Sequence, residues 1–151
     1  MQLGLIGLGH MGGNIARRLM RAGHTVVVFD AKPEPRAALA KDGAKDVDSL
    51  EAMVKAMTKP RAVWVMLPAG KITEETVQRL AGMMDQGDII IDGGNSYYKD
   101  DLRRSKQLEA KGIHYVDVGT SGGVWGLDRG YCMMIGGPKD VLRQLDPIFE
   151  T

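Results

Sequence analysis

Short apolar runs alternate with amphipathic stretches from the start of the chain. Residues 3–6 and 25–29 are continuous apolar or β-branched runs, a pattern that is typical of parallel strands covered on both faces. Between them, residues 14–22 carry apolar side chains at helical spacing, and Gly23 ends that pattern. We therefore predict a strand, a helix and a second strand within about thirty residues, the size of a βαβ unit.

The same alternation continues along the chain. Because repeated β–α–β order produces a parallel sheet with right-handed crossovers, we expect one doubly wound α/β domain over residues 1–151, with helices on both faces of a mainly parallel sheet. The further strands are predicted at residues 44–47, 61–67, 88–92, 113–118 and 131–135. The further helices are predicted at residues 33–41, 49–57, 72–84, 98–111 and 138–149. Asp48 is expected to cap the helix at 49–57, and Pro138 to be the first residue of the last helix.

A glycine-rich turn joins the first predicted strand to the first helix. In its GxGxxG pattern, Gly7 permits a tight turn, Gly9 lets a pyrophosphate approach the backbone, and Gly12 allows the helix to pack closely on the strand. The alternative is a tight turn that binds nothing. Asp30 follows about twenty residues later, where a carboxylate accepts ribose hydroxyls, and this context favours a Rossmann-type dinucleotide-binding fold.

The acid at the end of the second strand also bears on the choice of cofactor. A carboxylate accepts the hydroxyls of an adenosine ribose but repels a 2′-phosphate, so Asp30 favours NAD over NADP. Lys32 and Arg36 leave NADP open as the alternative, since either cation could reach a phosphate, although both also fit an exposed loop and helix face.

Glycine-rich segments follow several of the predicted strands. In an open α/β sheet the ligand lies outside the carboxyl ends of the strands, so we expect these segments to meet at one rim. Asn95 and Ser121 are short polar residues on that rim, and each taken alone fits helix capping or turn chemistry as well as ligand binding. The segments are residues 7–12, 30–32, 67–70, 93–96 and 119–126.

Composition changes this picture little. A formal charge of +1 favours neither nucleic acid nor an anionic membrane surface as a partner. The single Cys132 excludes an internal disulfide, and His10, His24 and His114 lack metal-ligand spacing, so we predict no metal site. No apolar run approaches the ~18 residues of a transmembrane helix, and no basic segment precedes the first strand, so we expect a cytoplasmic location.

Three segments together resemble the amino-terminal, coenzyme-binding domain of 6-phosphogluconate dehydrogenase, the decarboxylating enzyme. The first, GLIGLGHMGGNIARRL at residues 4–19, is shared with the wider β-hydroxyacid dehydrogenases. The other two are more specific, namely IIDGGNSYYKDDLRR at 90–104 and VDVGTSGGVWGLDRGYCMMIGG at 116–137.

The resemblance implies oxidation of 6-phosphogluconate, transfer of a hydride to the nicotinamide, and loss of carbon dioxide to give ribulose 5-phosphate, without a metal. NADP-using members carry Asn-Arg-Ser/Thr where this chain has Asp30-Ala31-Lys32, which favours the NAD-dependent branch. Carried over by motif, the cofactor would contact Gly7, Leu8, Gly9, His10, Met11, Gly12, Asp30, Ala31, Lys32, Leu67, Pro68, Ala69 and Asn95, and the sugar acid would contact Asn95, Ser121, Gly122 and Gly123.

The same resemblance implies what this chain lacks. The family's catalytic lysine and glutamate, and an all-helical domain that supplies most phosphate contacts and the interface of a homo-oligomer, lie beyond residue 151. We therefore expect no catalytic residue within the chain, and cofactor binding with little or no turnover. Two alternatives remain open, a 3-hydroxyisobutyrate-type dehydrogenase domain, which shares the opening motif and an SGG loop, and a non-catalytic NAD-sensing module.

Overall fold

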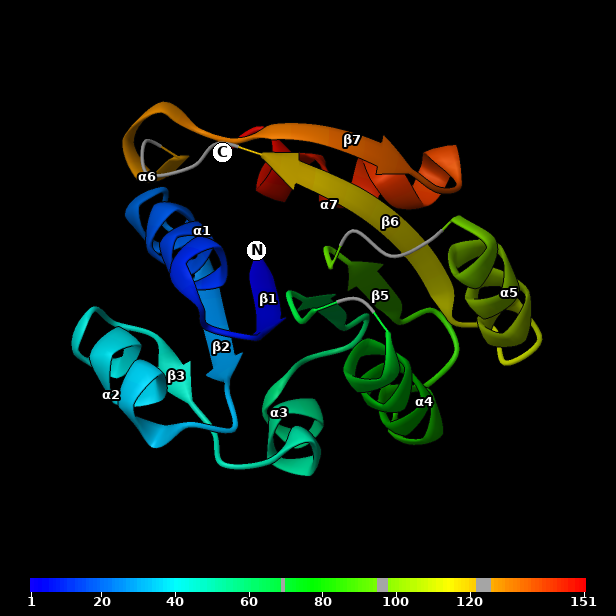
Figure 1. Cartoon of the computed structure of the whole chain (residues 1–151), viewed down its shortest axis with the longest axis horizontal. Coiled ribbons are helices and arrows are strands. Elements are labelled where there is room, and N and C mark those ends of the chain that lie inside the picture. Colours follow the sequence, from blue (N-terminus) through cyan, green and yellow to red (C-terminus); the bar gives the residue numbers. More distant parts are fainter. Residues whose placement is uncertain (69, 95–97, 122–125) are drawn as a thin grey trace.

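The computed structural model describes residues 1–68, 70–94, 98–121 and 126–151. They form a seven-stranded sheet in the order β3-β2-β1-β4-β5-β6-β7, flanked by helices on both faces (Figure 1). In chain order the elements are β1 (Gln2–Ile6), α1 (His10–Arg21), β2 (Thr25–Phe29), α2 (Pro33–Lys41), β3 (Lys45–Asp46), α3 (Leu50–Ala56), β4 (Ala62–Val65), α4 (Lys71–Met83), β5 (Ile89–Asp92), α5 (Tyr98–Glu109), β6 (His114–Ser121), α6 (Gly126–Arg129), β7 (Cys132–Gly136) and α7 (Lys139–Phe149).

The sheet is parallel except at one edge. Each neighbouring pair from β3 to β6 is parallel, and β7 runs antiparallel to β6. The predicted Rossmann-type, mainly parallel α/β fold is therefore confirmed. The chain builds the sheet outward from β1 in one direction through β2 and β3, and then crosses to β4 and builds in the other direction. The strand order thus reverses between β1 and β4, where open α/β sheets bind ligands.

Two apolar layers hold the helices onto the sheet. Because alternate residues of a strand point to opposite faces, neighbouring positions such as Val26 and Val27 belong to different layers. One layer packs the sheet against α1, α2 and α7, and the other packs it against α3, α4 and α5 (Figure 1). The buried helical side chains are Ile15, Leu19, Leu39, Val141, Leu145 and Ile148 in the first layer, and Leu50, Met53, Val54, Val77, Leu80 and Leu108 in the second.

Several predicted boundaries were wrong at helix ends. Helix α1 begins at His10 rather than near residue 14, because part of the glycine-rich segment itself adopts helical geometry. The N-cap of α3 is Ser49, whose Oγ accepts the N–H of Ala52 at 3.0 Å, and not Asp48. Pro138 is the N-cap of α7 and precedes its first residue. The short helix α6 was not predicted.

The described part of the chain contains no helix that is both long and apolar enough to cross a membrane.

Candidate functional site

The glycine-rich segment after β1, residues 7–12, is packed so tightly that only glycine fits at two of its positions. Gly7 has a φ of 90°, and a Cβ there would collide with the carbonyl oxygen of Met66. A Cβ on Gly12 would collide with the carbonyl oxygen of Gly7. A Cβ on Gly9, in contrast, would meet no atom within 4 Å. The packing of the chain therefore does not require glycine at position 9, and it leaves the backbone there open to a ligand.

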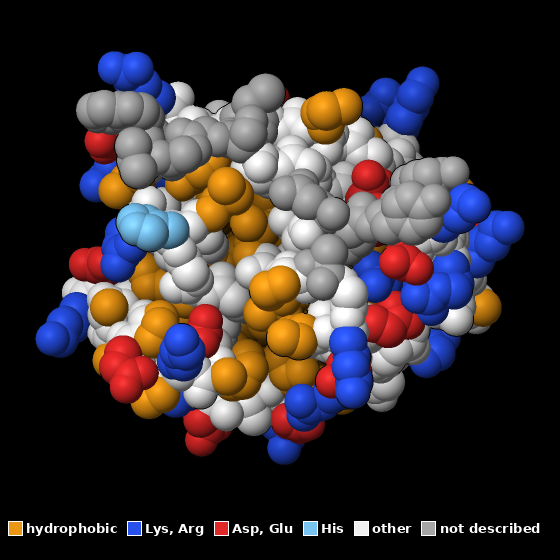
Figure 2. All heavy atoms as spheres, in the orientation of Figure 1, with side chains coloured by type: hydrophobic (Ala, Val, Ile, Leu, Met, Phe, Trp, Pro, Cys, Tyr) orange, Lys and Arg blue, Asp and Glu red, His pale blue; other side chains and the backbone are white. Residues whose placement is uncertain are grey.

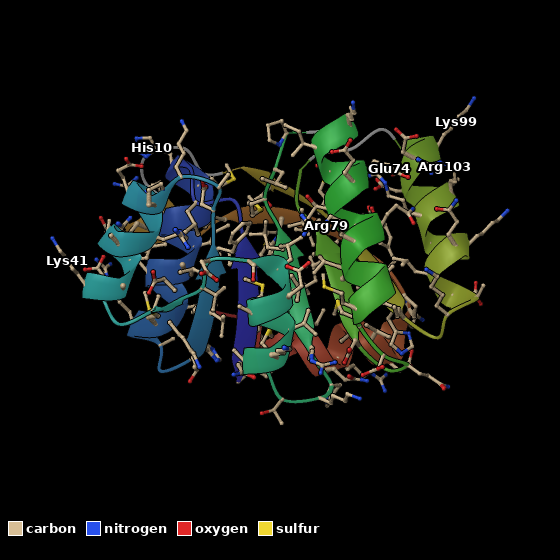
Figure 3. All side chains as sticks on the ribbon, turned by 90° about the horizontal axis from the view of Figure 1, so that it is seen from below. His10, Lys41, Glu74, Arg79, Lys99 and Arg103 are labelled. Atoms are coloured by element: carbon tan, nitrogen blue, oxygen red, sulfur yellow. The ribbon has the colours of Figure 1, made fainter. Side chains whose placement is uncertain are left out.

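Helix α1 presents an uncapped N-terminus at the same turn. Its N-cap is Gly9, which has no side-chain capping bond, and the first bond along the helix runs from the N–H of Gly13 to the carbonyl of Gly9 at 2.9 Å. Its first turn, which is fully described, holds no acidic residue, and His10 lies exposed at this end of the helix (Figure 3). An N-terminus of this kind attracts anions such as a pyrophosphate.

Asp30 joins the turn to the end of β2. Its Oδ2 accepts the backbone N–H of Leu8 at 2.8 Å, and its Oδ1 accepts the backbone N–H of Lys32 at 2.9 Å. The carboxylate is half-buried, and each oxygen keeps a further lone pair for a hydroxyl donor. Asp30 can therefore hold a ribose while it holds the turn.

The two cations near Asp30 lie in different environments. Arg36 donates from Nη1 to the carbonyl oxygen of Val47 at 2.7 Å, which ties its guanidinium to the end of β3. Lys32 and Ala31 are exposed. Arg36 is therefore engaged within the fold, whereas Lys32, whose backbone N–H bonds the carboxylate of Asp30, is exposed.

The loop after β4 lies beside the glycine-rich turn. A Cβ on Gly7 would lie 3.1 Å from Cδ2 of Leu67, so the two segments are in contact. Leu67 is half-buried and Pro68 is exposed, while the third predicted residue of this loop, Ala69, lies outside the described residues. These positions suit residues that line a bound cofactor at the strand-order reversal.

The turn after β5 packs onto the same end of β4. A Cβ on Gly93 would collide with the indole nitrogen of Trp64, and one on Gly94 with the carbonyl oxygen of Leu67. The structure thus brings this turn to the rim that carries the loops predicted to bind the cofactor. Ser121 ends β6 at the same rim, although its side chain is not described, and the predicted Asn95, Gly122 and Gly123 lie outside the described residues.

Figure 2 looks onto this rim. Apolar side chains gather in a hollow in the middle of the face, and charged side chains lie mainly around its edge.

A separate cavity of about 450 Å³ lies between α1, α7 and β7, where Ile15, Trp64 and Phe149 are among its lining residues. Among the predicted binding residues that the structure describes, none lines that cavity.

A buried charged cluster beneath the turn after β5 was not found from the sequence. Asp92 accepts hydrogen bonds from Nη1 of Arg104 at 3.1 Å and from the hydroxyl of Tyr115 at 2.8 Å, and that hydroxyl also lies 2.7 Å from Oδ1 of Asp101. Burial, together with the nearby charge of Asp92, raises the pKa of Asp101 to about 6. The only local signal was an aspartate at the end of an apolar strand.

Comparison with known proteins identifies the family. A family model described as the NAD binding domain of 6-phosphogluconate dehydrogenase matches residues 2–151. An NAD(+)-dependent, decarboxylating 6-phosphogluconate dehydrogenase of Haloferax volcanii is 41% identical over 151 residues, which are 100% of this chain and 50% of that protein. The chain spans half the length of this relative and about a third of the length of others, such as a decarboxylating 6-phosphogluconate dehydrogenase of Bacillus licheniformis.

Solved structures agree with this assignment. The 6-phosphogluconate dehydrogenase of Plasmodium falciparum, determined in its apo form and with NADP+ and 6-phosphogluconate, superimposes with a TM-score of 0.90 at 29% identity over 99% of this chain and 33% of that one. The 3-hydroxyisobutyrate dehydrogenase of Mycobacterium tuberculosis gives a TM-score of 0.90 at 27% identity over 99% of this chain and 50% of that one. The resemblance carried by the three sequence segments is confirmed, and the chain belongs to the family of NAD-binding domains of 6-phosphogluconate dehydrogenase.

Proposed function

We propose that this chain is the cofactor-binding part of an enzyme that oxidises 6-phosphogluconate with NAD and releases carbon dioxide to form ribulose 5-phosphate. The observation that carries the choice of NAD is Asp30, whose carboxylate is fixed at the rim by the N–H groups of Leu8 and Lys32. Similarity to an NAD(+)-dependent, decarboxylating relative at 41% identity supports the choice of reaction.

In this proposal the chain binds and orients the cofactor. The N-terminus of α1 and the open backbone at Gly9 hold the pyrophosphate, Asp30 accepts the hydroxyls of the adenosine ribose, and Leu67 and Pro68 line the nicotinamide side. NAD supplies the acceptor for the hydride. The reaction also needs a group that takes the proton of the substrate hydroxyl, and we assign that role to no residue of this chain.

Calorimetric titration of this chain with NAD and with NADP tests the cofactor assignment. We expect NAD to bind at least tenfold more tightly, because a 2′-phosphate would face the carboxylate of Asp30. Equal or tighter binding of NADP would overturn the assignment.

A second substrate has support from one observation, the structural similarity to a 3-hydroxyisobutyrate dehydrogenase at 27% identity. Titration of NADH-saturated chain with 6-phosphogluconate and with 3-hydroxyisobutyrate, followed by NMR chemical shifts, separates the two substrates. We expect 6-phosphogluconate to shift the amide of Gly94, and 3-hydroxyisobutyrate to have less effect at the same concentration. The reverse order would favour the second substrate.

The proposed partners and location follow from the proposed enzyme. The partner of the chain is a small sugar acid, the parent enzyme is a homo-oligomer assembled through a helical domain, and its location is the cytoplasm.

A further inference from the structure

The two loops that we propose for cofactor and substrate touch each other. Gly94, in the turn after β5, lies so close to the carbonyl oxygen of Leu67, in the loop after β4, that a Cβ on Gly94 would collide with it. The same Cβ would lie 3.4 Å from the hydroxyl of Thr73 in the first turn of α4. Thr73 is fully buried, and its hydroxyl donates to the carbonyl oxygen of Pro68 at 2.7 Å. The start of α4 therefore contacts both loops.

A line of charged groups runs from the same turn of α4 to the backbone of Gly94. Glu74 follows Thr73, and its Oε2 accepts a hydrogen bond from Nε of Arg104 on α5 at 2.5 Å. Arg104 donates from Nη1 to Oδ2 of Asp92 at 3.1 Å. The other oxygen of Asp92 accepts the N–H of Gly94 at 2.9 Å. We refer to Glu74, Arg104 and Asp92 as the relay.

Burial makes the relay costly as a source of stability. Arg104 is 1% exposed and Asp92 is 2% exposed, so both charges have lost most of their hydration. Well-packed apolar residues of similar volume often stabilise a fold as much as a buried ion pair does. What an apolar pair would not provide is a directed hydrogen bond to Gly94. The geometry therefore favours a role in orientation.

The outer end of the relay stays charged at neutral pH. Hydrogen bonds from Arg103 and Arg104 lower the pKa of Glu74 to about 2, although partial burial acts against them. Nη1 of Arg103 lies 2.7 Å from Oε1 of Glu74, and the two side chains meet between α4 and α5 (Figure 3). Glu74 thus presents a carboxylate to both arginines.

We propose that Glu74 is a positioning residue which, through Arg104 and Asp92, fixes the turn at Gly93 and Gly94 against Leu67 in the loop after β4. The relay would then set the substrate side of the rim relative to the cofactor side. Only the identity of the two ligands rests on the proposed function; the orientation of the turn does not.

The first test uses the ligand-free chain and the variants Glu74→Gln and Arg79→Gln. Arg79 is the matched control, because it lies on the same helix and pairs with Glu51 at 3.0 Å on the side away from α5 (Figure 3). We expect Glu74→Gln to speed hydrogen exchange of the Gly94 amide at least fivefold, and Arg79→Gln to change it less than twofold. Circular dichroism melts establish that each variant is folded; should Glu74→Gln unfold, Arg104→Lys is used under the same criteria.

The second test is a titration of NADH-saturated chain with 6-phosphogluconate. We expect Glu74→Gln to weaken binding of the sugar acid at least threefold and binding of NADH less than twofold, and we expect the effects of Glu74→Gln and Asp92→Asn to be less than additive. A Gly94 amide that exchanges at the wild-type rate in Glu74→Gln, or fully additive effects, would overturn the positioning role. Failure of the wild-type chain to bind either ligand would instead overturn the proposed function, and the exchange of Gly94 would still decide the role of Glu74.

Discussion

The carboxylate of Asp30 accepts the backbone N–H of Leu8 at 2.8 Å. The acid that we propose for the ribose is therefore also part of the turn that we propose for the pyrophosphate. A change at this position alters two properties at once, the choice of cofactor and the stability of the turn. Two variants distinguish these properties, one that removes the charge but keeps the hydrogen-bond acceptor, and one that removes both.

Replacement of Asp30 by alanine removes both the negative charge and the acceptor for Leu8. We expect Asp30→Ala to weaken NAD binding at least tenfold and to narrow the difference in affinity between NAD and NADP. It should also lower the free energy of unfolding by about 1–2 kcal/mol. Asp30→Asn removes the charge but keeps a carbonyl oxygen that accepts the N–H of Leu8. It should therefore narrow the difference in affinity between NAD and NADP with a smaller loss of stability. Calorimetry and urea unfolding measure these quantities, and unchanged discrimination in both variants would refute the assignment.

Two glycines of the turn should respond differently to alanine. A Cβ on Gly12 would collide with the carbonyl of Gly7, so we expect Gly12→Ala to destabilise the fold by about 3 kcal/mol or more. Gly9 has a φ of −65° and open space around it, so Gly9→Ala should cost about 1 kcal/mol or less, as a weaker N-cap. The same variant should weaken NAD binding at least tenfold. Thermal unfolding and calorimetry compare the two, and a Gly9→Ala chain with wild-type affinity would show that the ligand does not approach this backbone.

The sequence predicted most of the fold because the strands are covered on both faces. The apolar run at residues 25–29 became β2 with the same bounds, and the predicted helix at 33–41 became α2. The rim could also be predicted, because the carboxyl ends of parallel strands lie on one edge by topology alone. The binding roles of the predicted site residues stay predictions, and Asn95, Gly122 and Gly123 lie outside the described residues.

Tertiary contacts explain what the sequence did not predict. The segment that became α5 was expected to be a strongly charged helix, yet Arg104 within it is buried against Asp92 and Glu74. Its partners lie 12 and 30 residues away, on a strand and another helix, so no local pattern indicates the pairing. The helical start at His10 was missed for a related reason, since a glycine-rich segment has low helix propensity and packing imposes the helix.

Trp64 should tolerate phenylalanine better than its size suggests. The side chain is 2% exposed and meets Phe149 edge-to-face, with ring centroids 5.8 Å apart. Within the described part of the chain its buried indole N–H has no hydrogen-bond partner, which costs about 1–3 kcal/mol. Trp64→Phe removes that N–H, so we expect it to lower the free energy of unfolding by less than about 2 kcal/mol. Trp64→Ala should lower it by about 3–5 kcal/mol. Urea unfolding followed by circular dichroism measures both, and equal losses would indicate that the N–H is satisfied.

The contact between Tyr115 and two carboxylates has a consequence for protonation. The hydroxyl of Tyr115 lies 2.8 Å from Asp92 and 2.7 Å from Asp101, and a single phenolic proton can serve only one of them. A proton on Asp101 supplies the second hydrogen bond, since Asp92 also accepts from Nη1 of Arg104. This agrees with the pKa of Asp101, which is raised to about 6, mainly by burial of its carboxyl group.

The stability of the fold should therefore fall between about pH 5 and pH 6.5. The native state holds a proton on Asp101 with a pKa of about 6, whereas the unfolded chain releases it near the ordinary value of 3.8, so the native state binds more protons in between and its stability decreases as the pH rises. The full shift from 3.8 to about 6 corresponds to about 3 kcal/mol, of which about 1 kcal/mol is lost above pH 5. Glu74, with a pKa of about 2, acts in the opposite direction, but its contribution is lost only as the pH falls below about 4.5, outside this window. Asp101→Asn keeps the shape without the titration, so the free energy of unfolding measured with urea from pH 5 to pH 7 should fall less in the variant than in the wild-type chain. Some slope remains in both chains, because burial also raises the pKa of Asp117. Equal slopes in the two chains would show that Asp101 titrates normally.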